Sequence, residues 1–260
     1  SINIPKGEAS FWILFRYGPS ILLRHVWLYK VFIKVLRLRF GSNLKLVTDS
    51  ELIALSLKQL IGFDFIIFPI PHTEAYTSIP PLTSTANSDL TLWWPGEPRL
   101  SKGLDIVRKI SQMEVDSTLA MKLIVTKSSM IEPKAKGIEI ELTEDILTEA
   151  KYRNLFNRCD FVLLPYDKKI YGESTSGIFV EAIVAGKITL VSADTWMAYE
   201  LNKFKLTELV IDWGDKNLFG RIEAIYLNPQ IRIKVKKMQK AYSNYHNELN
   251  MSKILAGLLP

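Results

Sequence analysis

The sequence has one cysteine, Cys159, and only three histidines, His25, His72 and His246, among its 260 residues. A single cysteine cannot form an internal disulfide, which fits a reducing cytoplasmic setting. None of the histidines has the ligand spacing of a metal site, so no metal is expected. The sequence also lacks a run of eighteen uncharged apolar residues, and no signal peptide is recognised. We therefore expect a cytoplasmic protein without a spanning helix.

Positive charge is concentrated at one end of the chain. The formal net charge is +6, but residues 1–45 alone hold eight lysines and arginines against a single glutamate. No nucleic-acid-binding module and no interleaving of aromatic and basic residues accompanies this charge, so nucleic acid is not an expected partner. Apolar residues make up 48% of the sequence, which is ordinary for a globular protein with a sizeable core.

Strand-like and helix-like segments alternate along the chain and predict an α/β fold. Expected strands cover 8–19, 64–71, 90–96, 121–127, 137–142, 161–166, 188–192 and 208–213; expected helices cover 20–41, 101–112, 147–160, 177–187 and most of 216–259; and 44–62 is expected to be strand, turn and helix. Residues 72–88 are rich in proline, serine and threonine and indicate a linker. This pattern predicts two Rossmann-like, doubly wound domains that face a cleft, over 1–80 and 81–240, followed by a terminal helix over 241–260.

Residues 171–187, YGESTSGIFVEAIVAGK, follow an expected strand and open an expected helix. In open α/β sheets ligands bind beyond the carboxyl ends of strands, so this position favours a functional loop. The small residues at 174–177 would let backbone N–H groups approach an anion at the positive end of the helix. Glu173 would face the cleft, and Glu181 could accept hydrogen bonds from paired hydroxyls. Alternatively, the hydroxyl side chains only cap the helix and Glu181 is an exposed helix residue.

A second stretch, PGEPRLSKGLD at 95–105, also joins an expected strand to an expected helix. Arg99 and Lys102 place two cations on this turn. They suit a diphosphate, because arginine can grip two oxygens and lysine acts as a point charge. The alternative is a solvated basic turn without a ligand.

Together these stretches make residues 88 to 259 resemble the donor-binding half of a retaining glycosyltransferase with the GT-B fold. The family is the large group 1 family that uses nucleotide-sugars. The matching features are Gly96-x-x-Arg99-x-x-Lys102-Gly103, the segment LFNRCDFVLLPY, and Glu173-x7-Glu181 followed by Ala182 and Gly186. The resemblance implies transfer of a sugar from a UDP- or GDP-sugar to a saccharide or lipid-linked acceptor, with retention of configuration and without a metal or other cofactor.

The resemblance also implies roles for individual residues. Arg99 and Lys102 would neutralise the diphosphate as the glycosidic bond breaks, which stabilises charge that develops in the transition state. Glu181 would hold the ribose hydroxyls, and Glu173 would lie near the transferred sugar. The other implied donor-binding residues are Gly96, Ser174, Thr175, Ser176, Gly177 and Ile178. One departure is that the family usually has glycine three places after the first glutamate, where this chain has Ser176.

Residues 1–72 resemble only the last part of the family's acceptor domain. The early strand, the glycine-rich turn and the histidine that usually serves the reacting sugar are not visible, although such a domain normally needs about 100–150 residues or more. Three explanations stay open for this chain, which starts with Ser1. It is a fragment, segments have been dropped from it, or its acceptor domain is reduced.

The basic segment 20–40 is expected to be a helix with Lys30, Lys34 and Arg37 on one face. It could contact an anionic membrane surface, which would place the protein on the inner face of a membrane. Alternatively, it packs on the sheet with its cations in water. Arg16 and Tyr17 end the first expected strand and are expected at the cleft.

The main hypothesis is therefore a retaining hexosyltransferase of polysaccharide or glycolipid synthesis. Its alternative is a catalytically inactive nucleotide-binding or scaffolding partner of a complete glycosyltransferase, which the short front end keeps open. A third hypothesis is a membrane-surface anchor for a complex.

Overall fold

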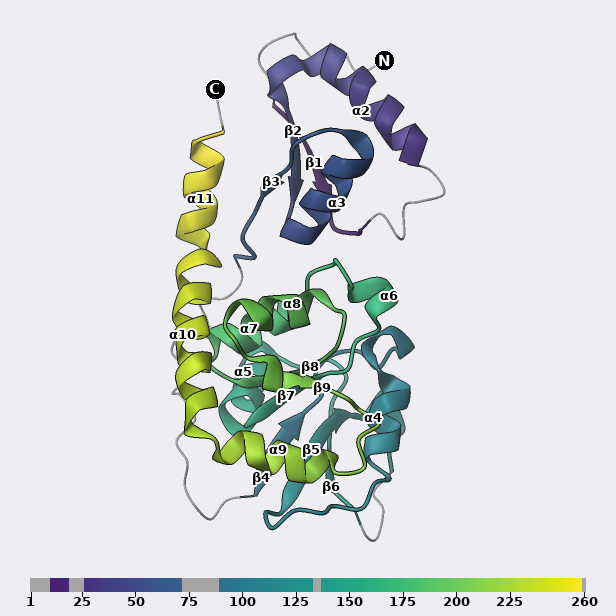
Figure 1. The fold of residues 1–260 in the computed structure, drawn as a ribbon, viewed down its shortest axis with the longest axis vertical. Helices are drawn as coiled ribbons and strands as arrows, with labels where there is room; N and C mark the ends of the chain where they lie inside the picture. Colours follow the sequence, from purple (N-terminus) through teal and green to yellow (C-terminus); the bar gives the residue numbers. More distant parts are fainter. Residues whose placement is uncertain (1–9, 19–25, 72–88, 133–136, 259–260) are drawn as a thin grey trace.

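The computed structural model describes residues 10–18, 26–71, 89–132 and 137–258. These residues form two α/β lobes, each built on one parallel sheet, that follow one another along the chain (Figure 1). His25, His72 and the expected linker at 72–88 lie outside the described residues, as does the start of the expected basic helix. None of the described helices is long and apolar enough to cross a bilayer.

The first lobe is a small parallel sheet with its strands in sequence order. Its strands are β1 (Phe11–Phe15), β2 (Leu44–Thr48) and β3 (Ile66–Ile67), and its helices are α2 (Val26–Phe40) and α3 (Glu51–Ile61). Because the strand order does not reverse, right-handed crossovers place both helices on the same face of the sheet. Strand β3 is shorter than the expected 64–71, since Pro69 and Pro71 have no N–H to donate to a ladder.

Local signals fix the two ends of α3. Ser50 caps its start, because its hydroxyl accepts a hydrogen bond from the N–H of Ile53 at 3.3 Å. Gly62 ends the helix with φ of 78°, a left-handed conformation that favours glycine. The inner side of the helix contributes Ile53, Leu57 and Ile61 to the core of this lobe.

The second lobe is a larger, doubly wound sheet. Its strands are β4 (Leu90–Trp93), β5 (Met121–Thr126), β6 (Glu139–Thr143), β7 (Phe161–Leu164), β8 (Ile188–Ser192) and β9 (Val210–Ile211). Its helices are α4 (Leu104–Ile110), α5 (Glu149–Arg158), α6 (Lys168–Tyr171), α7 (Gly177–Val184), α8 (Trp196–Lys203) and α9 (Leu218–Leu227).

All strands of this lobe are parallel, in the order β6-β5-β4-β7-β8-β9. β5 and β6 are added successively on one side of β4. β7 then lies on the other side of β4, and β8 and β9 extend the sheet in that direction. Strand order therefore reverses between the neighbours β4 and β7, the kind of point where open α/β sheets bind ligands. Both strands lie in the apolar core, and Cys159 just before β7 is fully buried. Burial raises the pKa of the Cys159 thiol to about 12, which fits a structural residue.

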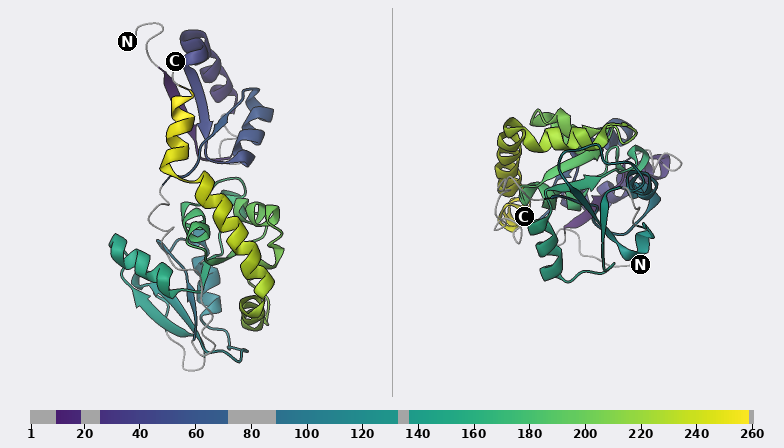
Figure 2. Two further views of the ribbon diagram at one scale, coloured as in Figure 1. Left: turned by 90° about the vertical axis from the view of Figure 1, so that its left-hand side faces the viewer. Right: turned by 90° about the horizontal axis from the view of Figure 1, so that it is seen from below.

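Two helices connect the lobes. α10 (Pro229–Tyr245) packs on the second lobe, and α11 (Glu248–Ala256) runs on beside the first lobe (Figures 1 and 2). Where they meet, the backbone N–H of Ile70 donates to Nδ1 of the buried His246 at 3.0 Å, and the Tyr245 hydroxyl donates to the carbonyl oxygen of Ile67 at 3.4 Å. This junction ties the end of the first lobe to the C-terminal helices.

We expect the stability of this junction to fall in mild acid. Burial lowers the pKa of His246 from 6.5 to about 4, so its stabilising effect is complete above pH 6.5 and is lost as pH falls. The free energy of unfolding should drop by about 2 kcal/mol between about pH 6.5 and 5, measured by denaturant titration. His246→Asn keeps an acceptor for Ile70 but does not titrate, so its curve should be flatter. Equal pH dependence in both proteins would contradict this role.

Candidate functional site

Two loops meet at the switch point of the second lobe. One follows β4 and carries Gly96, Arg99 and Lys102, and the other follows β7 and leads through α6 to α7. The backbone N–H of Asp167 in the second loop donates to the carbonyl oxygen of Ser101 in the first at 3.0 Å. Because β4 and β7 are neighbours in the sheet and this hydrogen bond joins the loops that follow them, the two loops lie side by side.

Gly103 lets the loops approach this closely. Its φ of 83° is left-handed, and an added Cβ would overlap the carbonyl oxygen of Pro165 and lie 2.6 Å from its Cγ. Only glycine fits both the conformation and the space. The expected helix at 101–112 therefore starts later, at Leu104, because Gly103 interrupts it.

Lys102 points into the junction of the two loops. A Cβ added at Gly96 would lie 3.2 Å from Nζ of Lys102 and 3.2 Å from Cδ1 of Ile178, so these three residues converge. Nζ also lies 5.9 Å from the centre of the Tyr166 ring. Trp94 holds the backbone of Lys102 in place, because the indole N–H of Trp94 donates to the Lys102 carbonyl oxygen at 3.1 Å. Burial lowers the pKa of Lys102, and the charge of Arg99 lowers it further.

Arg99 takes a different position from Lys102. Its side chain is exposed and forms an ion pair with the carboxylate of Glu97. This hydrogen bond raises the pKa of Arg99 and lowers that of Glu97, although both groups are in water. Tyr17 from the first lobe and Tyr171 lie close enough to influence the same guanidinium. An anion that binds Arg99 therefore has to compete with the carboxylate of Glu97. The spacing of Arg99 and Lys102 in the sequence does not predict this ion pair.

The residues before α7 are buried, and one of them caps the helix. The hydroxyl of Ser176 accepts a hydrogen bond from the N–H of Phe179 at 3.2 Å, so the capping interpretation holds for this side chain. The hydroxyls of Ser174 and Tyr166 are buried and have no hydrogen-bond partner of acceptable geometry among the described residues, although Tyr166 lies close to Ser176. Buried hydroxyls without partners are costly, which fits a site that a ligand or water completes.

Glu181 lies about one turn into α7 and is only partly exposed. The hydroxyl of Tyr152 donates to its Oε2 at 2.8 Å. Edge-on contacts with Trp93 and Phe156, both with ring centres 5.2 Å away, hold the Tyr152 ring. Glu181 is therefore not a solvated helix residue, and one of its oxygens has a fixed donor. Its partner Tyr152 is a site residue that sequence analysis missed.

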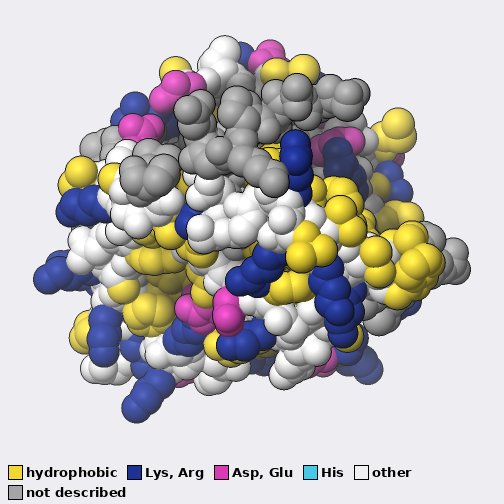
Figure 3. All heavy atoms as spheres, turned by 90° about the horizontal axis from the view of Figure 1, so that it is seen from above, with side chains coloured by type: hydrophobic (Ala, Val, Ile, Leu, Met, Phe, Trp, Pro, Cys, Tyr) yellow, Lys and Arg dark blue, Asp and Glu magenta, His cyan; other side chains and the backbone are white. Residues whose placement is uncertain are grey.

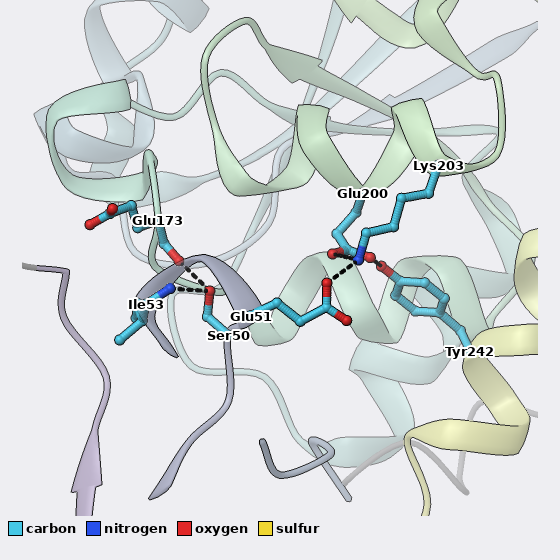
Figure 4. Close-up of polar contacts among 7 residues, drawn as sticks. All are labelled: Ser50, Glu51, Ile53, Glu173, Glu200, Lys203 and Tyr242. Carbon is cyan, nitrogen blue, oxygen red and sulfur yellow. Dashed lines mark hydrogen bonds and ion pairs between the residues drawn. The ribbon is translucent and has the colours of Figure 1, made fainter. Parts of the chain in front are cut away.

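Glu173 lies at the interface between the lobes. The Ser50 hydroxyl donates to its backbone carbonyl at 2.6 Å (Figure 4), and the Ser56 hydroxyl donates to its carboxylate. A Cβ added at Gly18, just after β1, would overlap the same carboxylate. The first lobe thus contacts both the backbone and the side chain of Glu173, the residue expected to lie near a transferred sugar. Sequence analysis did not expect Gly18 and Ser56 at this interface. Tyr17, which follows β1, lies close to Arg99, in agreement with its expected position at the cleft.

A second group of contacts joins the lobes beside Glu173. Lys203 of α8 pairs with Glu51 of α3 at 2.7 Å and with the buried Glu200 at 2.8 Å (Figure 4). The Tyr242 hydroxyl donates to the other oxygen of Glu200 at 2.7 Å. These residues surround a pocket of about 220 Å³ between the lobes. Within the described ranges, no three histidine, cysteine or acidic side chains come together as a possible metal site.

No protein-family model matches the sequence, and no protein of curated function matches it. Solved structures do match the fold. A sucrose-phosphate synthase from Thermosynechococcus elongatus has a TM-score of 0.64 at 11% identity, over 96% of this chain and 67% of that one. A glycosyltransferase from Rickettsia africae has a TM-score of 0.65 at 12% identity, over 95% and 69%. An E. coli trehalose-6-phosphate structure bound with UDP-2-fluoro glucose has a TM-score of 0.64 at 10% identity, over 95% and 67%.

At these identities the likeness concerns the fold, and the chain spans about two thirds of the length of those structures. In this chain the fold consists of two lobes with parallel sheets, and the strand order of the second sheet reverses at β4 and β7. The chain therefore has the GT-B fold of these glycosyltransferase structures, with a three-stranded first lobe in its described residues.

Proposed function

We propose that this protein transfers a sugar from a UDP- or GDP-sugar to a saccharide or lipid-linked acceptor, with retention of configuration. The observation that carries the proposal is the convergence of Lys102, Gly96 and the start of α7 at the switch point of the second sheet. Polysaccharide or glycolipid synthesis is the expected setting.

The diphosphate of the donor would lie between Lys102 and the start of α7. Lys102 brings a positive charge that is already partly desolvated, and α7 brings backbone N–H groups at the positive end of a helix. The unpartnered Ser174 hydroxyl offers one further donor. Positive charge held at the leaving phosphate stabilises the transition state without a metal. Arg99 would join after it releases Glu97.

The ribose would lie against Glu181. Tyr152 donates to one of its carboxylate oxygens and fixes the orientation of the group, and a carboxylate is an acceptor that suits vicinal hydroxyls. The E. coli neighbour is bound with a uridine diphosphate sugar, and the proposal extends this donor type to the present chain.

The transferred sugar would reach toward Glu173 and the interface between the lobes. Ser56 and Ser50 hold this residue from the first lobe, so the position of its carboxylate depends on how the lobes sit together. The acceptor would enter on the same side, because the first lobe supplies that wall.

A catalytically inactive nucleotide-binding partner of another enzyme is the competing function. The pairing of Arg99 with Glu97 and of Glu173 with Ser56 favours it, because both side chains are engaged within the protein. The two proposals differ in one measurable property. The enzyme should release nucleotide from a nucleotide-sugar as the sugar passes to an added saccharide or to water, whereas the inactive partner should bind the nucleotide and release none.

Separate substitutions of the two glutamates should divide binding from turnover. Glu181→Ala should weaken nucleotide binding about tenfold or more, because the ribose is bound throughout the reaction. Glu173→Ala should leave nucleotide affinity nearly unchanged and lower the rate of nucleotide release from the nucleotide-sugar. Calorimetry measures the first quantity and a coupled nucleotide-release assay the second. Equal effects of the two substitutions on both quantities would reject this division of roles.

A further inference from the structure

The outer face of α2 is apolar and open to solvent. Trp27, Val31, Val35 and Leu38 recur every three or four residues and are 65%, 51%, 56% and 89% exposed. Side chains at this spacing share one face of a helix. Leu28 and Phe32 widen the stripe, and a shallow groove runs between them and their neighbours.

The opposite face of α2 is already buried. Ile33 is fully buried and packs with Leu46 and Ile53 in the core of the first lobe. Packing on the sheet therefore accounts for only one side of the helix. The helix packs on the sheet with its cations in water, as one of the two interpretations of the sequence expects, but a second apolar face is exposed as well. A stripe of this size on a protein surface indicates an interaction site.

Positive charge flanks the exposed stripe. Lys30, Lys34, Arg37 and Arg39 are exposed, and α2 contains no acidic residue. Arg37 lies over the Phe63 ring at 5.0 Å, while the other three point into water. Figure 3 shows hydrophobic and basic side chains mingled at this end of the molecule.

We propose that α2 lies flat on an anionic lipid bilayer, with the stripe from Trp27 to Leu38 in the boundary between headgroups and acyl chains. The reason is charge complementarity: an apolar face of a helix that carries lysine and arginine and no carboxylate of its own matches a surface of acidic headgroups. Trp27 also suits this boundary, because its ring is apolar and its N–H can be hydrated. Binding of a lipid surface does not depend on the proposed glycosyl transfer.

Vesicle co-sedimentation of the full chain tests the proposal. The protein should sediment with vesicles of phosphatidylcholine and phosphatidylserine and bind vesicles of phosphatidylcholine alone much more weakly. The triple variant Lys30→Gln, Lys34→Gln, Arg39→Gln should lose about a hundredfold in affinity for the anionic vesicles. The triple variant Val31→Ser, Val35→Ser, Leu38→Ser should lose a similar amount, because it removes the buried apolar contact.

A matched control removes three exposed lysines from the other lobe: Lys236→Gln, Lys237→Gln, Lys240→Gln on α10. It loses the same net charge and should keep the wild-type affinity. All the altered side chains are exposed, so circular dichroism should be unchanged. The emission of Trp27 should also shift to the blue with anionic vesicles, and Trp27→Phe should abolish that shift.

Three results would overturn the proposal: no difference between the two vesicle types, equal losses in the α2 and α10 charge variants, or sedimentation that the serine variant does not change. Self-association of the chain that the serine variant abolishes, without lipid binding, would assign the face to a second copy instead. Nucleotide titration of the same proteins is a separate measurement, so failure of one proposal leaves the other testable.

Discussion

Lys102→Ala should lower the rate of nucleotide release from the nucleotide-sugar by about a hundredfold to a thousandfold, as removal of one preorganised charge-stabilising group does in other enzymes. The reason is the setting of the ammonium group. It is partly buried between Gly96 and Ile178 and over the Tyr166 ring, where water screens its charge less than on an open surface. Nucleotide affinity should also fall, because the diphosphate is present in both the ground and transition states.

Two matched variants separate charge from structure. Lys168→Ala removes an exposed lysine from α6, in the neighbouring loop, and should keep nearly full activity. Lys102→Arg keeps the charge and should retain more activity than Lys102→Ala. A Lys102→Ala protein with wild-type turnover would show that the charge at the switch point does not assist the reaction.

Gly103→Ala should destabilise the second lobe by about 3 kcal/mol or more, because the left-handed backbone and the overlap both cost free energy. The new Cβ would press on the Pro165 carbonyl, a backbone atom that cannot rotate away. Movement of Pro165 would disturb the end of β7 and the loop that carries Ser174. Denaturant unfolding followed by the fluorescence of the buried Trp93 and Trp94 measures the loss.

Gly62→Ala is the matched control for this substitution. Gly62 has a similar φ of 78°, but an added Cβ would meet nothing within 4 Å. Its cost should therefore be only the backbone strain, about 1 kcal/mol. If both variants lose the same free energy, close packing of the two loops is not what requires glycine at position 103.

Local signals in the sequence predict the architecture and the two loops of the site. The alternation of strands and helices predicts parallel sheets, and Ser50, Gly62 and Ser176 mark helix ends where the structure has them. These features act within a few residues of the chain, so one sequence is enough to find them. The order β6-β5-β4-β7-β8-β9 was not predicted, because strand neighbours depend on packing between distant segments.

The missed parts of the site come from long-range contacts. Ser56 and Glu173 are 117 positions apart, and Tyr152 and Glu181 are 29 apart, so no local pattern links them. The sequence also places Arg99 and Lys102 on one turn but does not show that their surroundings differ. The fold buries one and leaves the other with Glu97, which changes their expected contributions.

Calorimetric titration of the protein with UDP, GDP and ADP tests the central claim most directly. We expect saturable binding of one nucleotide, with affinity strongly reduced in both Lys102→Ala and Glu181→Ala and unchanged in Lys168→Ala. The nucleotide that binds would identify the base of the donor. If none of the three binds, or if the bound one keeps its affinity in both site variants, the switch point of the second lobe is not a donor site.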